Sequence, residues 1–127
     1  MSENMLKLIP KYEDYTRYEI EMIIKIPKMA KYLIGNEYIN NVVETLKDIY
    51  LIQKIDKKER LKVVNEIDGY FSYQRSMLRV MYKERYIDEK KFNVSMRYLK
   101  ELGLMLGGYV KSLGIYDKES EKVKNEN

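Results

Sequence analysis

The chain has 127 residues, of which 45% are apolar and 35% are charged, a composition that suits one compact domain. It contains no cysteine and no histidine, so disulfides, thiolate nucleophiles, imidazole bases and most zinc or haem sites are excluded. The remaining Lys, Tyr, Ser and carboxylate side chains form no recognisable catalytic constellation. We therefore expect a single domain over residues 1–127 that is not an enzyme and carries no metal or other cofactor.

The sequence also bears on the compartment. No apolar run approaches the ~20 residues that a membrane-spanning helix needs, and the first residues lack the apolar core of a signal peptide. These features predict a cytoplasmic protein with no membrane partner.

The modest net charge of +4 is unevenly distributed along the chain. Residues 1–69 hold twelve basic and twelve acidic side chains, whereas residues 70–114 hold nine basic and four acidic ones. Residues 115–127 hold three basic and four acidic side chains. The positive excess therefore lies in one stretch, which indicates a basic surface.

Two prolines and six glycines interrupt long stretches rich in Leu, Met, Ile, Lys and Glu, which favours an all-helical chain. Pro10 suits the first turn of a helix and Pro27 ends one, so the first helix is predicted over 11–26. A second helix is predicted over 34–55. Its expected buried residues follow the three-and-four spacing of one helix face: Ile39, Val42, Val43, Leu46, Ile49, Tyr50 and Ile52.

Two more helices are predicted over 58–86 and 89–113, with Asp56 and Asp88 as their N-caps. The apolar seam expected on the last helix is Phe92, Met96, Leu99, Gly103, Leu106, Val110 and Leu113. Gly114 should stop this helix, and the tail 115–127 should be flexible. Four helices with short connections predict an up-down-up-down four-helix bundle.

Glycines inside the last helix carry a cost of about 1 kcal/mol each relative to alanine. Gly103 and Gly107 lie one turn apart, so we expect them to allow close helix–helix packing, with Gly69 on a possible partner surface. A phosphate-binding loop is rejected because no strand precedes these glycines.

Arg75, Arg79 and Lys83 are spaced by four and predict a basic stripe on the third helix. Arg97 and Lys100 on the antiparallel fourth helix should extend this stripe into a nucleic-acid-binding patch. A solvated face that binds nothing would have the same spacing. Tyrosines among these cations offer stacking platforms for bases, although tyrosine is equally common at bundle rims and subunit interfaces.

Two segments resemble the accessory variability determinant proteins of diversity-generating retroelements. Residues 25–37 (KIPKMAKYLIGNE) are similar to that family's Lys-aromatic-Pro-basic loop, which leads into a Leu-Gly-acid helix start. Residues 101–112 (ELGLMLGGYVKS) are similar to its Met-Leu-Gly-Gly-aromatic-x-Lys-Ser helix ending. Ile26, Leu33 and Tyr109 depart from the residues common in the family, and proteins encoded in ribosomal RNA intervening sequences share the architecture.

This resemblance implies a non-catalytic homopentameric barrel of four-helix protomers. It also implies partners: a reverse transcriptase and its template RNA or complementary DNA, bound through positive surfaces. The alternatives are a bundle protein of the ribosomal RNA intervening-sequence type and a structural scaffold that binds no nucleic acid.

Overall fold

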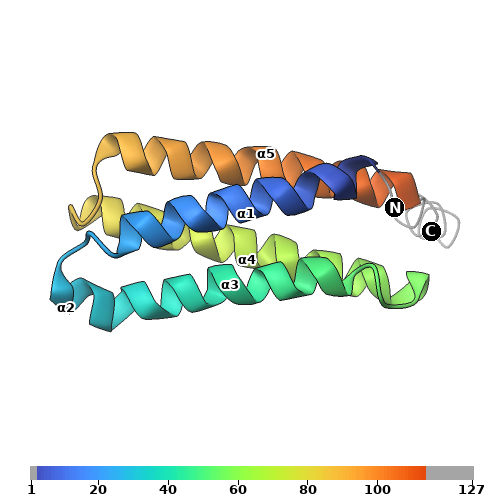
Figure 1. Cartoon of the computed structure of the whole chain (residues 1–127), viewed down its shortest axis with the longest axis horizontal. Helices are drawn as coiled ribbons and strands as arrows, with labels where there is room; N and C mark the ends of the chain where they lie inside the picture. Colours follow the sequence, from blue (N-terminus) through green and yellow to red (C-terminus); the bar gives the residue numbers. More distant parts are fainter. Residues whose placement is uncertain (1–2, 114–127) are drawn as a thin grey trace, which may run out of the picture.

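A computed structural model describes residues 3–113, and every regular element among them is helical. The four long helices are α1 (Glu3–Ile23), α3 (Asn36–Leu51), α4 (Lys57–Lys83) and α5 (Glu89–Leu113) (Figure 1). A short helix α2 (Lys28–Ala30) and a π-helical turn η1 (Lys31–Gly35) precede α3.

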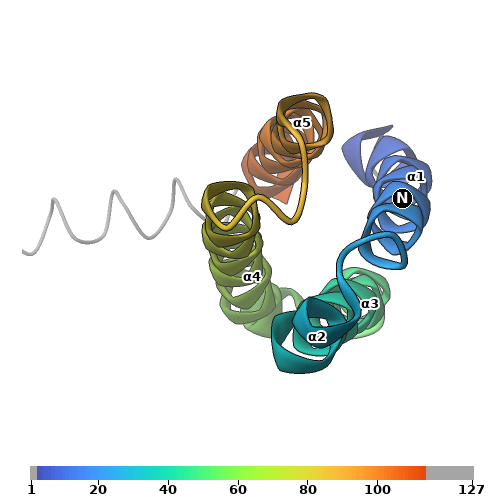
Figure 2. The same cartoon turned by 90° about the vertical axis from the view of Figure 1, so that its left-hand side faces the viewer.

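The long helices form the predicted all-α four-helix bundle. Seen along the bundle axis, they follow one another around a square in the order α1, α3, α4, α5 (Figure 2). Each long helix packs against the helices before and after it in this ring, and α5 closes it against α1. No helix within residues 3–113 is long and apolar enough to cross a membrane.

The first helix begins earlier than the predicted range of 11–26. Pro10 lies inside α1 instead of in its first turn. Proline removes a backbone hydrogen bond in a helix interior, at a cost of about 3 kcal/mol. The preceding turns nevertheless bury Met5 and Leu8 completely, and this apolar contact with the core offsets the loss.

The second helix also differs from its predicted bounds of 34–55. Helical backbone already starts at Lys28, directly after Pro27, and the regular helix α3 ends at Leu51. Gly35 closes the π-helical turn at a point where α1 comes near. A Cβ atom at Gly35 would lie 3.3 Å from side-chain atoms of both Ile23 and Ile26, so glycine permits this close approach.

The α4–α5 connection explains why α4 ends at Lys83 and not at residue 86. Arg85 adopts a positive φ of 64°, and its N–H donates to the Tyr82 carbonyl at 3.0 Å. The Tyr86 N–H donates to the Met81 carbonyl at 2.8 Å. These two bonds make a Schellman motif, with arginine in the left-handed position that glycine usually takes.

The two predicted N-caps behave differently. Asp56 occupies the N-cap position of α4 with extended backbone, but its side chain makes no capping hydrogen bond. Asp88 does cap α5, because its carboxylate accepts the Lys91 N–H at 2.8 Å. The predictions for Gly114 and the tail 115–127 lie outside the described residues.

Each long helix buries one stripe with alternating steps of three and four residues. The stripe of α4 is buried at Val64, Ile67, Phe71, Gln74, Leu78 and Met81. On α3, Val43 and Tyr50 were expected to be buried but are exposed. On α5 the buried stripe runs through Ser95, Leu99, Leu102, Leu106 and Tyr109. It is rotated about the helix axis relative to the predicted seam, and only Leu99 and Leu106 belong to both. Phe92, Met96 and Val110 are consequently only half-buried.

The buried stripes include polar side chains at mid-bundle. Glu19, Thr45, Gln74 and Ser95 come from the four long helices and are fully buried. The phenol of Tyr15 lies among them, within 2.9 Å of Gln74 Oε1. These polar groups form a hydrogen-bonded layer between apolar layers.

The Schellman motif yields a test of backbone strain. Arg85→Gly should stabilise the fold by about 0.5–1 kcal/mol, because glycine adopts positive φ without the Cβ clash. Lys62→Gly, at an exposed interior position of α4, is the control and should destabilise by about 1 kcal/mol. Urea denaturation measures both; equal losses in the two variants would contradict a strained Arg85.

Candidate nucleic-acid interface

Two contacts fix how α4 and α5 are aligned along the bundle axis. The rings of Tyr82 and Phe92 stack with centroids 4.7 Å apart. Nearer the middle, the Arg75 guanidinium reaches α5, since a Cβ atom at Gly103 would lie 3.4 Å from its Nη2. The antiparallel pairing of the two helices is therefore fixed over the length that carries the predicted basic stripe.

Four of the five predicted cations are exposed, namely Arg79, Lys83, Arg97 and Lys100, and Arg75 is half-buried. Arg79 and Lys83 follow Arg75 at successive turns, so they line the edge of α4 that borders α5. Lys100 lies one turn from Gly103, on the edge of α5 that borders α4. We call Arg75, Arg79, Lys83 and Lys100 the basic strip.

Arg97 lies apart from this strip. It lines a hollow between α1 and α5 together with Lys11, Val94, Tyr98 and Glu101. The sequence grouped Arg97 with Lys100 by spacing alone, but the two side chains point toward different neighbouring helices. The merged patch therefore consists of four cations, with Arg97 at its border.

The nearest acidic side chain of α5 is already engaged. Glu101 Oε2 lies 2.5 Å from the Lys11 ammonium, which also sits 5.3 Å from the centroid of the Tyr98 ring. The hydrogen bond to Glu101 raises the pKa of Lys11 against the opposing effect of desolvation. This pair ties α1 to α5 and removes Glu101 as a partner for the strip.

The cations of the strip have no carboxylate partner. Among residues 5–112, no oxygen of Asp or Glu lies within 4.0 Å of a side-chain nitrogen of Arg75, Arg79, Lys83, Arg97 or Lys100. Arg79 instead donates to the Ser76 hydroxyl of its own helix at 2.9 Å. The strip therefore presents cationic groups to solvent that are free to contact phosphate oxygens.

Tyrosines near the strip differ in how accessible their rings are. Tyr82 is partly exposed beside Lys83, although one face of its ring stacks on Phe92. Tyr98 packs against Tyr15 and Tyr18, with ring centroids 5.8 and 5.9 Å away. Tyr82 is thus a better stacking platform for a base than Tyr98.

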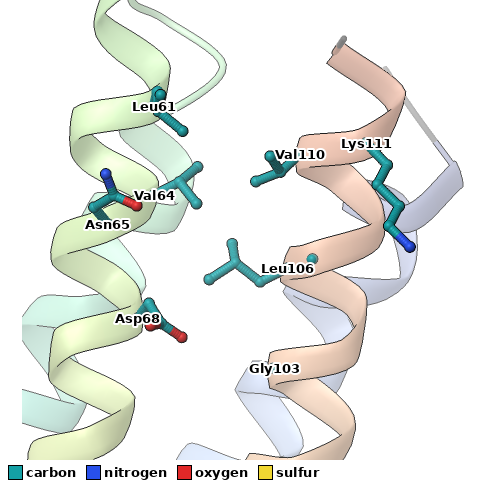
Figure 3. A pocket seen from close by; sticks show the side chains of 9 residues that line it. Leu61, Val64, Asn65, Asp68, Gly103, Leu106, Val110 and Lys111 are labelled. Atoms are coloured by element: carbon teal, nitrogen blue, oxygen red, sulfur yellow. The ribbon is translucent and has the colours of Figure 1, made fainter. Parts of the chain in front are cut away.

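The α4–α5 interface opens into a hollow of about 260 Å³ at its other end (Figure 3). Leu61, Val64, Leu106 and Val110 supply its apolar walls. Polar residues also line the hollow, namely Asn65 and Asp68 of α4 and Lys111 of α5, whose side chain extends away from α4. Within residues 5–112, no three acidic side chains gather in a way that would hold a metal ion.

The expected packing role of Gly103 and Gly107 inside the bundle is not seen. Both glycines line the hollow, and a Cβ atom at Gly107 would meet nothing within 4 Å. At Gly103 the neighbour is the flexible Arg75 side chain instead of a helix backbone. Gly69 likewise faces open space. Gly103 and Gly107 lack this packing role because the buried stripe of α5 is not the predicted seam, so both glycines lie at the border of the buried face.

Comparison with known proteins assigns no family. No protein-family profile matches the sequence, and no solved structure matches it. A segment of 45 residues is 48% identical to the small ribosomal subunit protein eS1 of Picrophilus torridus. The match covers 35% of this chain and 21% of that relative, so the chain spans only about a fifth of the relative's length.

The open space at Gly107 predicts that alanine is tolerated there. Gly107→Ala should stabilise the isolated chain by up to about 1 kcal/mol, because alanine restricts the unfolded backbone and adds no clash. Gly35→Ala is the control and should destabilise, since its Cβ atom would press on Ile23 and Ile26. Thermal melts of both variants give the measurement, and a lower melting temperature for Gly107→Ala would show that another surface covers this glycine.

Proposed function

We propose that this protein is a non-catalytic accessory subunit of a diversity-generating retroelement. In this role it binds template RNA or complementary DNA through the basic strip, and it binds the reverse transcriptase as a protein partner. The observation that carries the nucleic-acid part is the set of cations on α4 and α5 that lack carboxylate partners in the described residues. The retroelement context rests on the resemblance of residues 25–37 and 101–112.

The charge distribution supports a phosphate-binding role. Residues 70–114 carry nine basic and four acidic side chains, and they include all of the strip. Contacts between cations and phosphates release counterions and carry no base specificity. A surface of this kind suits a subunit that holds many different sequences for a separate enzyme.

Exposed apolar side chains support assembly into the proposed homopentamer. Met29, Tyr32 and Leu33 lie together at one end of the bundle and are 69%, 80% and 67% exposed. Leu104 on the outer side of α5 is 70% exposed. Clustered apolar groups of this size commonly mark a protein–protein contact. In a closed ring the basic strips of the copies would add to one stronger field.

The nucleic-acid part is tested by reversing two charges of the strip. Arg79→Glu/Lys83→Glu should weaken binding to RNA of any sequence and reduce the slope of log affinity against log salt by about two, because each lost cation removes about one phosphate contact. Fluorescence anisotropy with a labelled RNA over a salt series measures both quantities.

The matched control for this test is Lys54→Glu/Lys62→Glu. It makes the same change in net charge at exposed positions outside the strip, and the salt slope should stay at the parent value. Circular dichroism checks that both double variants fold. Equal affinities and slopes for the two variants would show that the strip is a solvated face, and the scaffold alternative would then stand. A gene placed within ribosomal RNA would favour the intervening-sequence type.

The assembly part is tested in solution. Light scattering should give a mass of about five protomers at micromolar concentration, as expected for a closed cyclic oligomer. Met29→Lys/Leu33→Lys should lower this mass if the exposed apolar end forms the contact, whereas Lys54→Glu/Lys62→Glu should not. A monomeric parent protein would contradict the homopentamer.

A further inference from the structure

Side chains from all four long helices meet in the centre of the bundle around one buried carboxyl group. This group belongs to Glu19 of α1, and none of its surface is exposed. Ser95 of α5 donates to Glu19 Oε2 at 2.6 Å, and Tyr38 Oη of α3 lies against Glu19 Oε1 in a very short contact. Gln74 of α4 joins the cluster through Tyr15. No arginine or lysine within residues 5–112 forms an ion pair with Glu19.

The directions of the hydrogen bonds can be worked out from the α3 backbone. The Tyr12 hydroxyl donates to the Val42 carbonyl at 2.6 Å, and the Thr45 hydroxyl donates to the Asn41 carbonyl at 2.7 Å. Each hydroxyl has a single proton, so toward Gln74 both oxygens can only accept. Gln74 Nε2 lies 3.3 Å from each of them and 2.9 Å from Asn41 Oδ1, and its two protons are shared among these three acceptors. This fixes the orientation of the Gln74 amide, and its Oε1 must face Tyr15.

The hydroxyl protons of Tyr15 and Tyr38 can be counted in the same way. Gln74 Oε1 cannot donate, so the Tyr15 hydroxyl gives its proton to Gln74, at 2.9 Å. The Tyr38 oxygen lies 3.1 Å from the Tyr15 oxygen, and only the proton of Tyr38 is left to bridge them. The contacts Gln74–Tyr15, Tyr15–Tyr38 and Tyr38–Glu19 therefore share only the two phenol protons when Glu19 is ionised and Tyr38 donates to it. All three contacts hold a proton when Glu19 is protonated and donates to Tyr38.

We infer that Glu19 is protonated in the folded bundle and is the first donor of a one-way hydrogen-bond chain, so that ionisation of Glu19 acts as a pH switch that loosens the core. The chain runs from Glu19 to Tyr38, Tyr15 and Gln74, and it ends on carbonyl groups of α3. When Glu19 ionises, the Tyr38 proton turns toward the carboxylate. The two phenol oxygens then face each other with no proton between them.

The surroundings of Glu19 favour its neutral form. Burial raises the pKa of Glu19 to about 7. The hydrogen bonds that Ser95 and Tyr38 donate to the ionised carboxylate lower this pKa by a smaller amount. Burial also raises the pKa values of Tyr15 and Tyr38, so both phenols stay neutral across the range in which Glu19 titrates. The titratable or charged groups near Glu19 or its partners are Tyr12, Tyr15 and Tyr18 of α1, Tyr38 of α3, Arg75 of α4 and Tyr98 of α5.

The sign of the effect follows from linkage between protonation and folding. The pKa of Glu19 is about 7 in the folded chain, against 4.5 for an unperturbed glutamic acid, so the folded state holds the proton more tightly. The stabilisation is complete below pH 4.5, decreases as the pH rises toward 7, and is absent above it. Between these limits the ratio of folded to unfolded protein should fall by about three-hundredfold.

Thermal or urea unfolding between pH 5 and pH 8.5 tests the switch. The parent protein should lose stability as the pH rises, and Glu19→Gln should not. A neutral glutamine can donate its N–H to Tyr38 and accept from Ser95, which keeps the direction of the chain. Glu13→Gln removes an exposed carboxylate from the same helix and should retain the parent's pH dependence. Parallel curves for the parent protein and Glu19→Gln would overturn the inference.

A second measurement requires no change to the core. Carbon-13 NMR of the parent chain, labelled at its glutamate side chains, should show one carboxyl that titrates near neutral pH. That signal should be missing from Glu19→Gln if the variant folds. If the variant does not fold, the parent titration decides alone. A spectrum in which every glutamate titrates near the ordinary value of 4.5 would overturn the inference.

Discussion

The hydrogen-bonded layer at mid-bundle determines how the four long helices are aligned. Apolar contacts have no direction, so leucine and isoleucine stripes alone would tolerate a slide of one helix turn. Glu19, Tyr38, Gln74 and Ser95 do not tolerate it, because a slide would leave buried polar atoms without partners at a cost of about 1–3 kcal/mol each. Since each long helix contributes to the layer, the layer specifies one register for the whole ring.

This internal register decides which surface residues become neighbours. Ser95 donates a hydrogen bond to Glu19 and thereby fixes the position of α5 along α1. Gln74 sets the height of α4 against α3, and the next residue, Arg75, then lies across from Gly103. The basic strip is therefore a consequence of the core: Arg79, Lys83 and Lys100 come together only because polar atoms inside the bundle hold α4 and α5 at these heights.

The sequence predicted the four helices and the buried positions Val42, Ile49 and Ile52 of the second one, because their apolar spacing is regular. The buried stripe of α1 was not predicted, because the three-and-four pattern of Met5, Leu8, Tyr12 and Tyr15 continues through Glu19, and apolar spacing does not select a carboxylate as a core residue. That pattern was the available signal. The error on α5 has a related cause: Ser95 marks the true stripe, whereas apolar Phe92 and Met96 suggested a neighbouring one. Spacing also grouped the cations of the strip, but it did not reveal that Arg97 lines a hollow between α1 and α5 instead.

The basic strip and the core are also coupled in energy. Cations at successive turns of α4 repel one another when no carboxylate neutralises them, and this repulsion weakens the helix hairpin at low salt. The directional core layer and the Lys11–Glu101 pair hold α5 in place against it. A bound polyanion would remove the repulsion, so the ligand would stabilise the folded state by the same charges that attract it. On the proposed function, the stability of the α4–α5 hairpin and its affinity for phosphate must therefore change together with salt.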